Sequence, residues 1–302
     1  MNLIYKNKVI IGTWPLSGDY GSVSLTQIER CLIKSLEMDF CEFDTAPNYG
    51  NGFAEFCLGK VFKGRSGIKI NTKFGNIPFE GKAFDLKKLR QSVENSLKRL
   101  NCERIHVLYL HNPRKDIDNY DDVFQLYEEL ITEGKIEKKG ISLAKGFCYE
   151  KYVKLEEFHM VQDDANLLCR ESLEKYSERN FTFVARSPLA SGLLSGNVTT
   201  GKKYSKDDHR SDWLVDNRLE SLVKQVNEIA KISPMTVSSL ARKYLLENNN
   251  IAKVIFGIKR EEHLDDIIQD LSSHGISLKF MEDFDQLYSN NFNLKTGEYI
   301  AY

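Results

Sequence analysis

Short apolar runs and amphipathic segments alternate along almost the whole chain. The apolar runs are rich in β-branched and aromatic side chains and end at glycine, proline or polar residues, which is typical of buried strands. The segments between them repeat apolar residues at helical spacing. Residues 85–100 show this clearly, because Leu89, Val93 and Leu97 fall on one face and Asp85 is a suitable N-cap. The pattern predicts a series of β–α units.

Eight strands are expected from this alternation, and nearly all of them are followed by helices. The expected strands are residues 8–14, 40–44, 68–73, 105–111, 138–143, 159–163, 181–185 and 253–256. The expected helices are residues 26–38, 53–62, 85–100, 120–133, 149–157, 171–178, 216–232, 235–248, 261–271 and 278–287. A polar tail is expected after the last helix.

Strands that alternate with helices form a parallel sheet, and eight such units close into a (β/α)8 TIM barrel. The length of 302 residues suits one barrel, and no Pro/Ser-rich linker divides the chain, so residues 1–302 are expected to form a single domain. A doubly wound sheet would usually carry G-x-G-x-x-G after its first strand. The residues that follow Ile11, Gly12-Thr13-Trp14 and beyond, contain no such motif.

The composition narrows the function classes. Hydrophobic residues make up 41% and charged residues 28% of the chain, and the net charge is −1. A balanced charge gives no indication of nucleic-acid or membrane-surface binding. No run approaches the roughly 20 apolar residues of a membrane span, and the N-terminus lacks a signal-peptide core, so we expect a cytoplasmic protein. The six cysteines form no C-x-x-C pair and the six histidines are dispersed, so no metal site is expected.

The candidate chemistry is centred on residues 40–51. Asp44 ends the second expected strand, and Tyr49 follows just beyond the break at Pro47. Lys73 ends the third strand and His111 the fourth, and the carboxyl ends of barrel strands form the active-site face. A tyrosine has a pKa of about 10 and needs a nearby cation to exchange a proton near neutrality. Each residue alone could be an ordinary strand end or loop residue, but together they predict a proton donor with its cation, its anchor and a second polar group.

These residues belong to a set of motifs that covers essentially the whole chain. In chain order the motifs are F-D-T-A-P-x-Y-G (43–50), N-T-K (71–73), L-Y-L-H-N-P (108–113), G-K-I-x-x-x-G-I-S (134–142), V-Q-x-x-x-N (161–166), S-P-L-A-S-G-L-L-S-G (187–196) and V-I-x-G-x-K-R (254–260). The set resembles the aldo-keto reductase superfamily, in its bacterial NADP-dependent form. The resemblance implies a barrel that binds a nicotinamide cofactor across its top without a Rossmann domain.

The resemblance also implies roles for the four central residues. Tyr49 would donate the proton to the carbonyl oxygen. Lys73, paired with Asp44, would lower the pKa of Tyr49, and His111 would orient and polarise the carbonyl. The hydride must come from the cofactor, because no side chain can supply one.

The resemblance implies cofactor contacts at several strand ends. Ser142 and Gln162 would bind the nicotinamide carboxamide, while Leu143 stands where the family usually has an asparagine. Arg186 replaces a common aromatic residue and would stack on the nicotinamide ring. The other cofactor-binding residues expected at this end and along the pyrophosphate are Thr13, Trp14, Asp44, Ser187, Leu189, Ser191 and Gly192.

At the adenine end, two adjacent cations precede a helix, which suits the 2′-phosphate of NADPH and makes NADH the less favoured cofactor. These cations are Lys259 and Arg260, preceded by Gly257 and Ile258. By the same resemblance, His263 would contact the phosphate and Asp266 the adenine.

The expected substrate-binding residues are Trp14, Phe53, His111 and Trp213. Core packing is the alternative for Phe53 and Trp213, and residues 202–213 form either a lid or a solvated charge run. The expected function is NADPH-dependent reduction of a small aldehyde or ketone, including sugar-derived ones. Two alternatives stay open: a sugar-modifying epimerase or dehydratase with tightly bound NADP, and a cofactor-binding regulatory subunit. The sequence decides neither the physiological substrate nor the oligomeric state.

Overall fold

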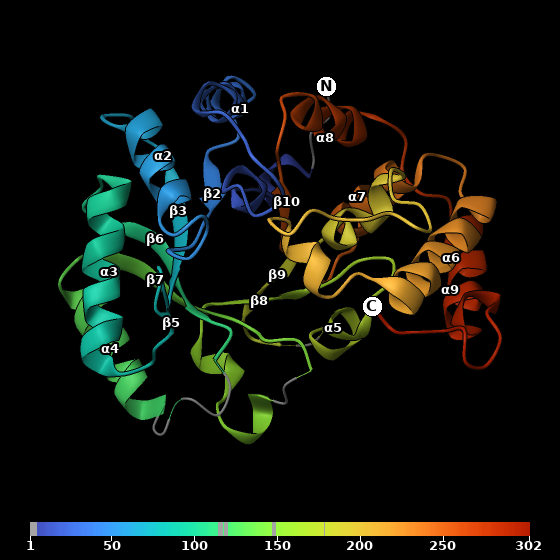
Figure 1. Cartoon of the computed structure of the whole chain (residues 1–302). Helices are drawn as coiled ribbons and strands as arrows, with labels where there is room; N and C mark the ends of the chain where they lie inside the picture. The colour runs from blue at the N-terminus through green and yellow to red at the C-terminus, as the bar shows by residue number, and fades with distance from the viewer. Residues whose placement is uncertain (1–4, 114–116, 118–119, 147–148, 178) are drawn as a thin grey trace.

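A computed structural model describes residues 5–113, 117, 120–146, 149–177 and 179–302. Within these residues, eight parallel strands close into a barrel in the order β1-β10-β9-β8-β7-β6-β3-β2 (Figure 1). The barrel strands are β1 (Val9–Gly12), β2 (Glu42–Asp44), β3 (Lys69–Phe74), β6 (Ile105–His111), β7 (Ile136–Ser142), β8 (Met160–Asp164), β9 (Thr182–Arg186) and β10 (Lys253–Gly257). The (β/α)8 barrel expected from the sequence is confirmed.

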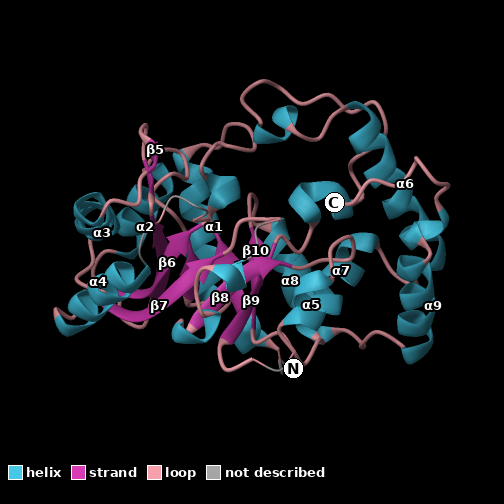
Figure 2. Cartoon of the chain, turned by 90° about the horizontal axis from the view of Figure 1, so that it is seen from below, coloured by secondary structure: helices cyan, strands magenta, loops and turns pink. Residues whose placement is uncertain are grey.

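Helices surround the barrel and follow most of its strands. They are α1 (Leu25–Glu37), α2 (Phe53–Phe62), α3 (Leu86–Leu100), α4 (Tyr120–Thr132), α5 (Glu171–Lys175), α6 (Asp216–Ile232), α7 (Val237–Leu246), α8 (Glu262–Ser272) and α9 (Leu278–Ser289). Several begin at a side chain that accepts a hydrogen bond from the first turn, as Asp85 does from the Lys88 amide at α3. Outside the barrel, α6 and α9 pack side by side (Figures 1 and 2).

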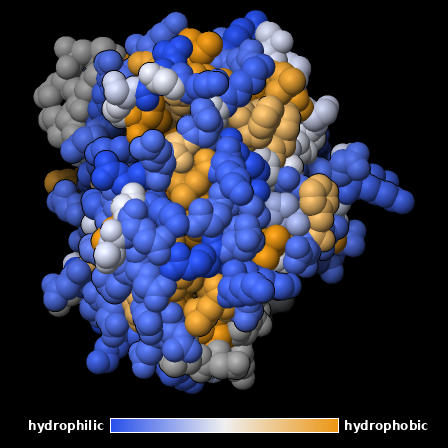
Figure 3. All heavy atoms as spheres, turned by 90° about the vertical axis from the view of Figure 1, so that its left-hand side faces the viewer, coloured by the Kyte–Doolittle hydropathy of each residue, from blue (hydrophilic) through white to orange (hydrophobic). Residues whose placement is uncertain are grey.

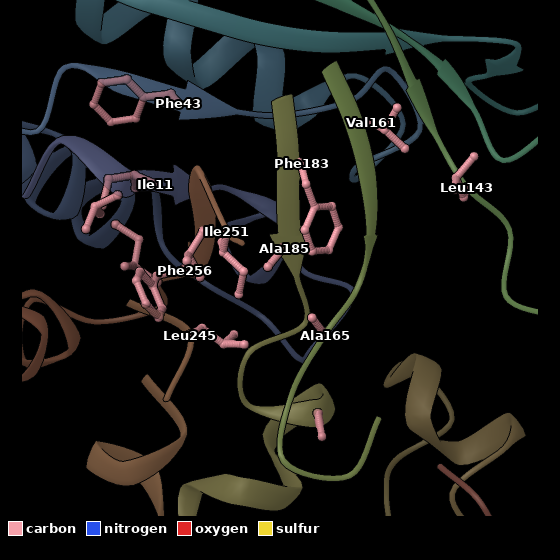
Figure 4. Close-up of a cluster of buried hydrophobic side chains, with 14 of the residues drawn as sticks. Ile11, Phe43, Leu143, Val161, Ala165, Phe183, Ala185, Leu245, Ile251 and Phe256 are labelled. Atoms are coloured by element: carbon pink, nitrogen blue, oxygen red, sulfur yellow. The ribbon is translucent and has the colours of Figure 1, made fainter. Parts of the chain in front are cut away.

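The apolar side chains of the strands fall into two clusters, because successive strand residues point to opposite faces of the sheet. Inside the barrel lies a small apolar cluster of Ile10, Val107, Tyr109, Met160, Val184 and Ile255. The strand residues between them belong to a larger cluster that lies between the strands and the helices. Figure 4 shows part of this outer cluster, including Ile11, Phe183 and Phe256. Alternation along each strand therefore decides which side chains reach the barrel interior.

Some local expectations were wrong. A hairpin of two very short strands, β4 (Asn76–Ile77) and β5 (Gly81–Lys82), follows β3 and was not expected. The expected helix over residues 149–157 is two separate 3-10 turns, Tyr149–Lys151 and Leu155–Glu157. Helix α5 ends at Lys175, and residue 178, where a longer helix was expected to end, lies outside the described residues.

The expected polar tail is exposed over most of its length, but two of its aromatic side chains are buried. Phe292 is fully buried in a 3-10 turn, Asn291–Asn293, and stacks on Tyr299 with 6.4 Å between ring centroids. Tyr302 is buried as well. The tail therefore folds back onto the barrel and its helices.

The face that carries α2, α3 and α4 shows mostly hydrophilic side chains with apolar strips between them (Figure 3). In the part of the chain that the structure describes, no helix has both the length and the apolar character of a membrane span. The five described cysteines, Cys31, Cys41, Cys57, Cys102 and Cys169, are free thiols.

Candidate active site

Polar side chains gather at the carboxyl ends of the strands, on the inner face of the barrel. Two residues beyond the inward-facing Tyr109, β6 ends at His111, and two residues beyond Met160, β8 carries Gln162. The same spacing places Arg186 at the end of β9. Because parallel strands end at one rim, these side chains converge there, as the sequence had led us to expect.

The centre of the site is a buried ion pair beside a phenol. The Lys73 ammonium donates to Asp44 Oδ1 at 2.6 Å and to the main-chain oxygen of Thr45 at 2.8 Å. It lies 3.2 Å from the Tyr49 hydroxyl. Gln162 Nε2 donates to the second oxygen of Asp44 at 2.7 Å. The exposed fractions are only 2% for Lys73, 3% for Asp44 and 9% for Tyr49, so solvent does not screen these contacts.

The pKa shifts in this centre follow from burial and from the mutual contacts. Burial raises the pKa of Tyr49 above its usual value, and the Lys73 cation partly opposes that shift. Burial alone would lower the pKa of Lys73, but the attraction of Asp44 and Tyr49 outweighs it and the net shift is upward. The centre therefore combines a charged ammonium with a neutral phenol, which has a proton to give and a cation to stabilise the phenolate.

His111 faces the phenol from the next strand of the barrel. Its ring is edge-on to Tyr49, with 6.3 Å between centroids. Burial, and then the cations of Lys73 and Arg186, hold its pKa well below the usual range, so the imidazole is neutral. The Nδ1 atom of His111 is buried and has no hydrogen-bond partner among the described residues. A neutral imidazole with a free ring nitrogen can position a carbonyl oxygen.

Thr13 and Trp14 follow β1 and border the phenol. The Thr13 hydroxyl donates to the main-chain oxygen of Asp44 at 3.0 Å, so it supports the strand end that carries the carboxylate. The Trp14 ring stacks on Tyr49 with 5.7 Å between centroids and 14° between planes. Tyr20 packs edge-on against Trp14 at 5.1 Å. Trp14 therefore forms an aromatic wall beside the phenol, and Tyr20 extends it.

Within residues 202–213, His209 and Arg210 pack on this wall, whereas the charged residues Lys202, Lys203, Lys206 and Asp207 are exposed. His209 lies 4.6 Å from Trp14 and 4.4 Å from Tyr20 between ring centroids, and its amide donates to the main-chain oxygen of Asp19. Arg210 stacks over the Tyr20 ring at 5.1 Å. Sequence reasoning missed Tyr20 and His209, because the contact joins loops that lie far apart along the chain.

The two other aromatic candidates lie differently. Phe53 starts α2 and packs, partly buried, against the large apolar core, in line with the alternative named for it above. Trp213 ends the 202–213 segment and meets the Tyr302 ring edge-on at 6.0 Å. Trp213 therefore borders the rim next to a residue that was not a candidate.

Where the nicotinamide is expected to bind, the Arg186 side chain donates four hydrogen bonds. Its guanidinium donates to Asp164 Oδ1 at 3.1 Å, Asn112 Oδ1 at 3.2 Å, Ser142 Oγ at 3.0 Å and the Leu143 main-chain oxygen at 2.6 Å. Asn112 also lies 3.4 Å from the Ser142 hydroxyl. The side-chain amide of Asn112 therefore lies beside Ser142, where Leu143 has no polar side chain to offer. Asn112 directly follows His111, and this position in the sequence could have identified it as a candidate.

The turn after β9 is tight. Ser187, Ala190, Ser191 and Gly192 all have positive φ, between 46° and 94°. The amides of Ala190 and Gly192 donate inside the turn, to the main-chain oxygens of Ser187 at 2.9 Å and Leu189 at 2.8 Å. Leu189 lies between Ser187 and Ala190 in the same turn and is half-buried. The predicted pyrophosphate residues thus share one compact turn next to Arg186.

Three hydrogen bonds that involve side chains fix this turn. The Ser187 hydroxyl donates to Asp164 Oδ1 at 2.7 Å, and the Asn166 amide donates to the Ser187 main-chain oxygen at 3.1 Å. Arg210, from the 202–213 segment, donates to the Ser191 main-chain oxygen at 3.3 Å. Asp164 therefore links the turn to Arg186, since it accepts from both.

The adenine-end candidates follow β10 at the outer edge of the rim. The Lys259 ammonium donates to the main-chain oxygens of Tyr20 at 2.7 Å and Gly21 at 3.2 Å. The Lys259 amide donates to His263 Nδ1 at 3.2 Å, and Arg260 lies 3.5 Å from His263 Nε2. Lys259 therefore ties down the loop that carries Tyr20, a role that the sequence did not reveal.

The remaining candidates near this edge present less to a ligand. The Ile258 side chain is fully buried, so only its main chain faces the rim, and Gly257 ends β10. Asp266 lies exposed on α8, whose first turn is acidic. These residues follow β10 at the outer edge of the rim and do not converge on the buried centre. Among the residues that the structure describes, no group of three or more His, Cys, Asp or Glu side chains is arranged to hold a metal.

Comparisons with known proteins agree with the geometry. The pattern of the Aldo/keto reductase family matches residues 8–289. Uncharacterized oxidoreductase YqkF of Bacillus subtilis (strain 168) is 30% identical over 247 residues, which are 79% of this chain and 80% of that protein. L-glyceraldehyde 3-phosphate reductase of Escherichia coli (strain K12) is 26% identical over 306 residues, 91% of this chain and 87% of that protein.

Two solved structures share the fold. Glycerol dehydrogenase AKR11B4 from Gluconobacter oxydans superimposes with a TM-score of 0.78 at 22% identity, over 97% of this chain and 95% of that one. Aldo-keto reductase AKR11C1 from Bacillus halodurans, in its holo form, gives a TM-score of 0.76 at 24% identity, over 93% and 91%. The match to the family pattern covers nearly the whole chain, and the chain therefore belongs to the aldo/keto reductase family, whose members are oxidoreductases that use nicotinamide cofactors.

Proposed function

We propose that the chain, acting as a single domain, reduces a small aldehyde or ketone to an alcohol with NADPH. The observation that carries the proposal is the position of the Lys73 ammonium, 2.6 Å from Asp44 and 3.2 Å from the Tyr49 hydroxyl. This arrangement gives a buried phenol a cation that stabilises its conjugate base, which a proton donor requires. The bound nicotinamide would supply the hydride.

The proton step follows from the same contacts. During the reduction negative charge would develop on the carbonyl oxygen, and the Tyr49 hydroxyl would deliver its proton there. The products are an alcohol and a phenolate next to the Lys73 ammonium. Asp44 keeps that ammonium in place, and water later returns a proton to Tyr49. Burial strengthens each of these interactions, because solvent does not screen them.

His111 orients the substrate in this proposal. Its neutral ring lies edge-on to Tyr49 and offers a buried ring nitrogen without a partner among the described residues. A carbonyl oxygen between the imidazole and the phenol would receive hydrogen bonds from both. Two donors fix the carbonyl better than one, which favours attack on a single face.

The chain's own residues fit a nicotinamide dinucleotide. Ser142 and Gln162 present polar atoms at adjacent strand ends, and Gln162 Oε1 is buried without a partner in the described part of the chain. Asn112 adds an amide beside Ser142, in compensation for Leu143. The Ser187–Gly192 turn would lie along the pyrophosphate, and its Ala190 and Gly192 amides donate inside the turn instead of to the ligand. The Arg186 guanidinium, held in place by its four partners, would face the nicotinamide ring.

The preference for NADPH rests on Lys259 and Arg260. They precede α8, where the free N–H groups of a helix start add to the attraction for a phosphate. Arg260 is exposed, and among the described residues its guanidinium has a hydrogen-bond contact with His263 alone, so it is available to a 2′-phosphate. NADH would lack the group that these cations bind.

Consumption of NADPH with a panel of carbonyl compounds tests the proposal. A relative named L-glyceraldehyde 3-phosphate reductase and a structural neighbour named glycerol dehydrogenase make small hydroxylated aldehydes and ketones the first compounds to try. Steady oxidation of NADPH with a carbonyl is the expected result. Binding of NADPH without turnover of any carbonyl would instead support a regulatory subunit. Conversion of a sugar without net NADPH loss would support an internal redox enzyme.

A further inference from the structure

The proposed proton donor and its cation come from two different segments of the chain. Tyr49 lies in the loop before α2 and Lys73 lies in β3, so their 3.2 Å contact depends on how α2 is placed against β3. Main-chain hydrogen bonds join the Tyr49 loop to the start of α2. The Ala54 amide donates to the Tyr49 oxygen at 3.3 Å, and the Phe53 amide donates to the Gly50 oxygen at 3.1 Å. A shift of α2 would therefore move the phenol.

A fully buried carboxylate connects α2 to β3. Glu55, in the first turn of α2, accepts a hydrogen bond from the Thr72 hydroxyl at 2.6 Å. Both side chains are 0% exposed. Glu55 comes shortly after Tyr49 in the chain, and Thr72 immediately precedes Lys73. The bond therefore ties together the two segments that must keep the phenol and the ammonium in contact.

This bond lies on the outer side of the barrel wall. Neighbouring residues of a strand point to opposite faces of the sheet. Lys73 pairs with Tyr109, whose side chain lies inside the barrel, whereas Thr72 pairs with Leu108, which belongs to the outer cluster. Glu55 is thus behind the strand that carries the ammonium, and it can influence the reaction centre only through the positions of α2 and β3.

Arg99 fixes the carboxylate of Glu55. Its Nε atom donates to the second oxygen of Glu55 at 2.7 Å, and its guanidinium also donates to the Ser96 hydroxyl at 3.2 Å. Arg99 lies in the last turn of α3, which packs beside α2 (Figure 1). The pairing offsets the free-energy cost of burying the charge of Glu55, and it sets the direction in which the carboxylate meets Thr72.

We propose that Glu55 is a positioning residue for the proton donor: through its bond to Thr72 it keeps Tyr49 at the distance from Lys73 that proton transfer requires. The inference rests on the proposed function and goes beyond it by identifying a second restraint on this contact. Asp44 holds the Lys73 ammonium from inside the barrel, and Glu55 holds the Tyr49 segment from outside. Apolar packing allows small displacements of a helix, whereas a short hydrogen bond has a defined length and direction.

The test removes the hydroxyl that Glu55 binds. Thr72→Val lacks it at a similar side-chain volume, and Thr72→Ser keeps it. The matched control is Ser35→Ala, because Ser35 is equally buried and its hydroxyl donates to the Cys31 main-chain oxygen within α1. Thr72→Ala, which also lacks the hydroxyl, is measured beside Thr72→Val so that a folding defect of one variant does not decide the result.

Turnover is measured with NADPH and glyceraldehyde, or the best carbonyl compound of the panel. We expect kcat to fall about tenfold or more in Thr72→Val, because a displacement of about 1 Å at a reacting group can cost about a hundredfold. It should stay near the unchanged value in Thr72→Ser and Ser35→Ala, and KM for NADPH should not change in any of them. A loss of kcat in Thr72→Val no larger than that in Ser35→Ala would overturn the proposal.

A Tyr49→Phe background distinguishes positioning from a merely structural role. Without the phenol hydroxyl there is no proton donor to misplace, so Thr72→Val should reduce the residual turnover no further. The residual rates are measured at high enzyme concentration, together with the melting temperature of each variant. An equal fold-loss from Thr72→Val with and without the Tyr49 hydroxyl would show that the bond only stabilises the barrel, and the inference would be wrong.

Crystal structures of Thr72→Val and Thr72→Ser give a readout that does not depend on activity. We expect the distance between Lys73 Nζ and Tyr49 Oη to lengthen from 3.2 Å to beyond hydrogen-bond range in Thr72→Val, but not in Thr72→Ser. If no carbonyl is reduced by the unchanged protein but the distances change as expected, the positioning role of Glu55 stands and the proposed reaction is wrong. If carbonyls are reduced but neither distance nor turnover responds, the reaction stands and this inference is wrong.

Discussion

Gln162 donates a 2.7 Å hydrogen bond to the oxygen of Asp44 that does not contact Lys73. Its own oxygen, Oε1, is buried and has no partner among the described residues. One amide therefore anchors the carboxylate behind the proton donor and also presents a free acceptor to the proposed carboxamide site. Because the oxygen and nitrogen of this amide belong to one planar group, a shift of Gln162 at the proposed cofactor site would also move its hydrogen bond to Asp44, next to the proposed proton donor.

Replacing Gln162 with leucine should consequently affect both functions. Loss of a hydrogen bond to a buried charge typically costs about 1.5–3 kcal/mol, so we expect turnover to fall roughly tenfold to a hundredfold. The affinity for NADPH should fall as well, because an acceptor for the carboxamide disappears. Steady-state kinetics and fluorescence titration of NADPH measure the two effects. The control is Gln125→Leu, on the exposed surface of α4. A loss of affinity for NADPH at unchanged turnover in Gln162→Leu would show that Asp44 does not need the Gln162 amide.

Replacing Tyr49 with phenylalanine removes the proposed proton donor and little else. The ring still stacks on Trp14, but the hydroxyl beside Lys73 is gone. General acid catalysis contributes about 10²–10⁴-fold, so we expect turnover to fall by about a thousandfold while NADPH binds nearly as before. Turnover and a binding titration check the prediction. Unchanged NADPH oxidation with a good substrate would remove Tyr49 from the mechanism.

Much of this site follows from the sequence for a physical reason. Strand alternation puts every second residue inside the barrel, and parallel strands end at one rim, so Asp44, Lys73 and His111 could be placed from the chain alone. The (β/α)8 fold was predictable on the same grounds. The short hairpin after β3 and the 3-10 turns over residues 149–157 were not, because such short elements lack a periodic pattern.

The features that were missed depend on contacts between distant segments. Arg186 looked like a stacking residue, and its bonds to Asn112 and Asp164 appear only when three strand ends meet. Tyr20 meets His209 and Arg210 across the rim. Lys259 holds the main-chain oxygen of Tyr20. The last residues contain lysine, glutamate and asparagine, which hid the burial of Tyr302. Local patterns cannot reveal such long-range contacts.

The adenine end offers a test of cofactor choice. We expect Lys259→Ala with Arg260→Ala to reduce the preference for NADPH over NADH at least tenfold, because charge-assisted hydrogen bonds to a phosphate are worth about 1.5–3 kcal/mol each. The ratio of the dissociation constants for the two cofactors is the measurement. Equal weakening of both would mean that these residues hold the pyrophosphate or shape the loop.

The single variants separate the two roles of these cations. In the part of the chain that the structure describes, the Arg260 guanidinium has its one hydrogen-bond contact with His263, so Arg260→Ala should change NADPH binding alone. Lys259 also holds Tyr20 and Gly21 by their main-chain oxygens, so Lys259→Ala should in addition loosen the loop and raise KM for the carbonyl with either cofactor. Identical effects of the two single variants would contradict the tie between Lys259 and this loop.

His111 predicts how stability depends on pH. Its pKa is well below the usual range in the folded protein, chiefly through burial, whereas in the unfolded chain it is about 6.5. The unfolded state therefore binds more protons below pH 6.5, so stability falls as the pH drops from about 6.5 toward the folded-state pKa. His111→Asn removes this contribution. We expect the fall in melting temperature between pH 7 and pH 5 to be smaller in the variant, and an equal fall would mean that His111 takes up a proton in the folded protein.

Asp44, Lys73 and Tyr49 should behave as one unit in catalysis. If Lys73 stabilises the Tyr49 phenolate, then Lys73→Met should cost nearly as much turnover as Tyr49→Phe, since a phenol with a pKa near 10 exchanges protons poorly at neutral pH. The double variant should lose little more than either single variant, because residues that act together are strongly non-additive. Asp44→Asn should be milder, as the cation remains but loses its anchor. Turnover of all four variants tests the dependence, and additive losses in log turnover would show that Lys73 does not act through Tyr49.

A drop in stability could imitate this result, and the buried ion pair provides the control. Lys73→Met leaves the Asp44 carboxylate buried with Gln162 as its one remaining side-chain partner among the described residues, and breaking a buried pair typically costs about 3–5 kcal/mol. Asp44→Asn added to Lys73→Met removes the unpaired charge and should restore most of the melting temperature. Turnover should stay low in that double variant, because the cation beside Tyr49 is still absent. If turnover recovers together with the melting temperature, Lys73 is a structural residue of the barrel and the proton donor works without it.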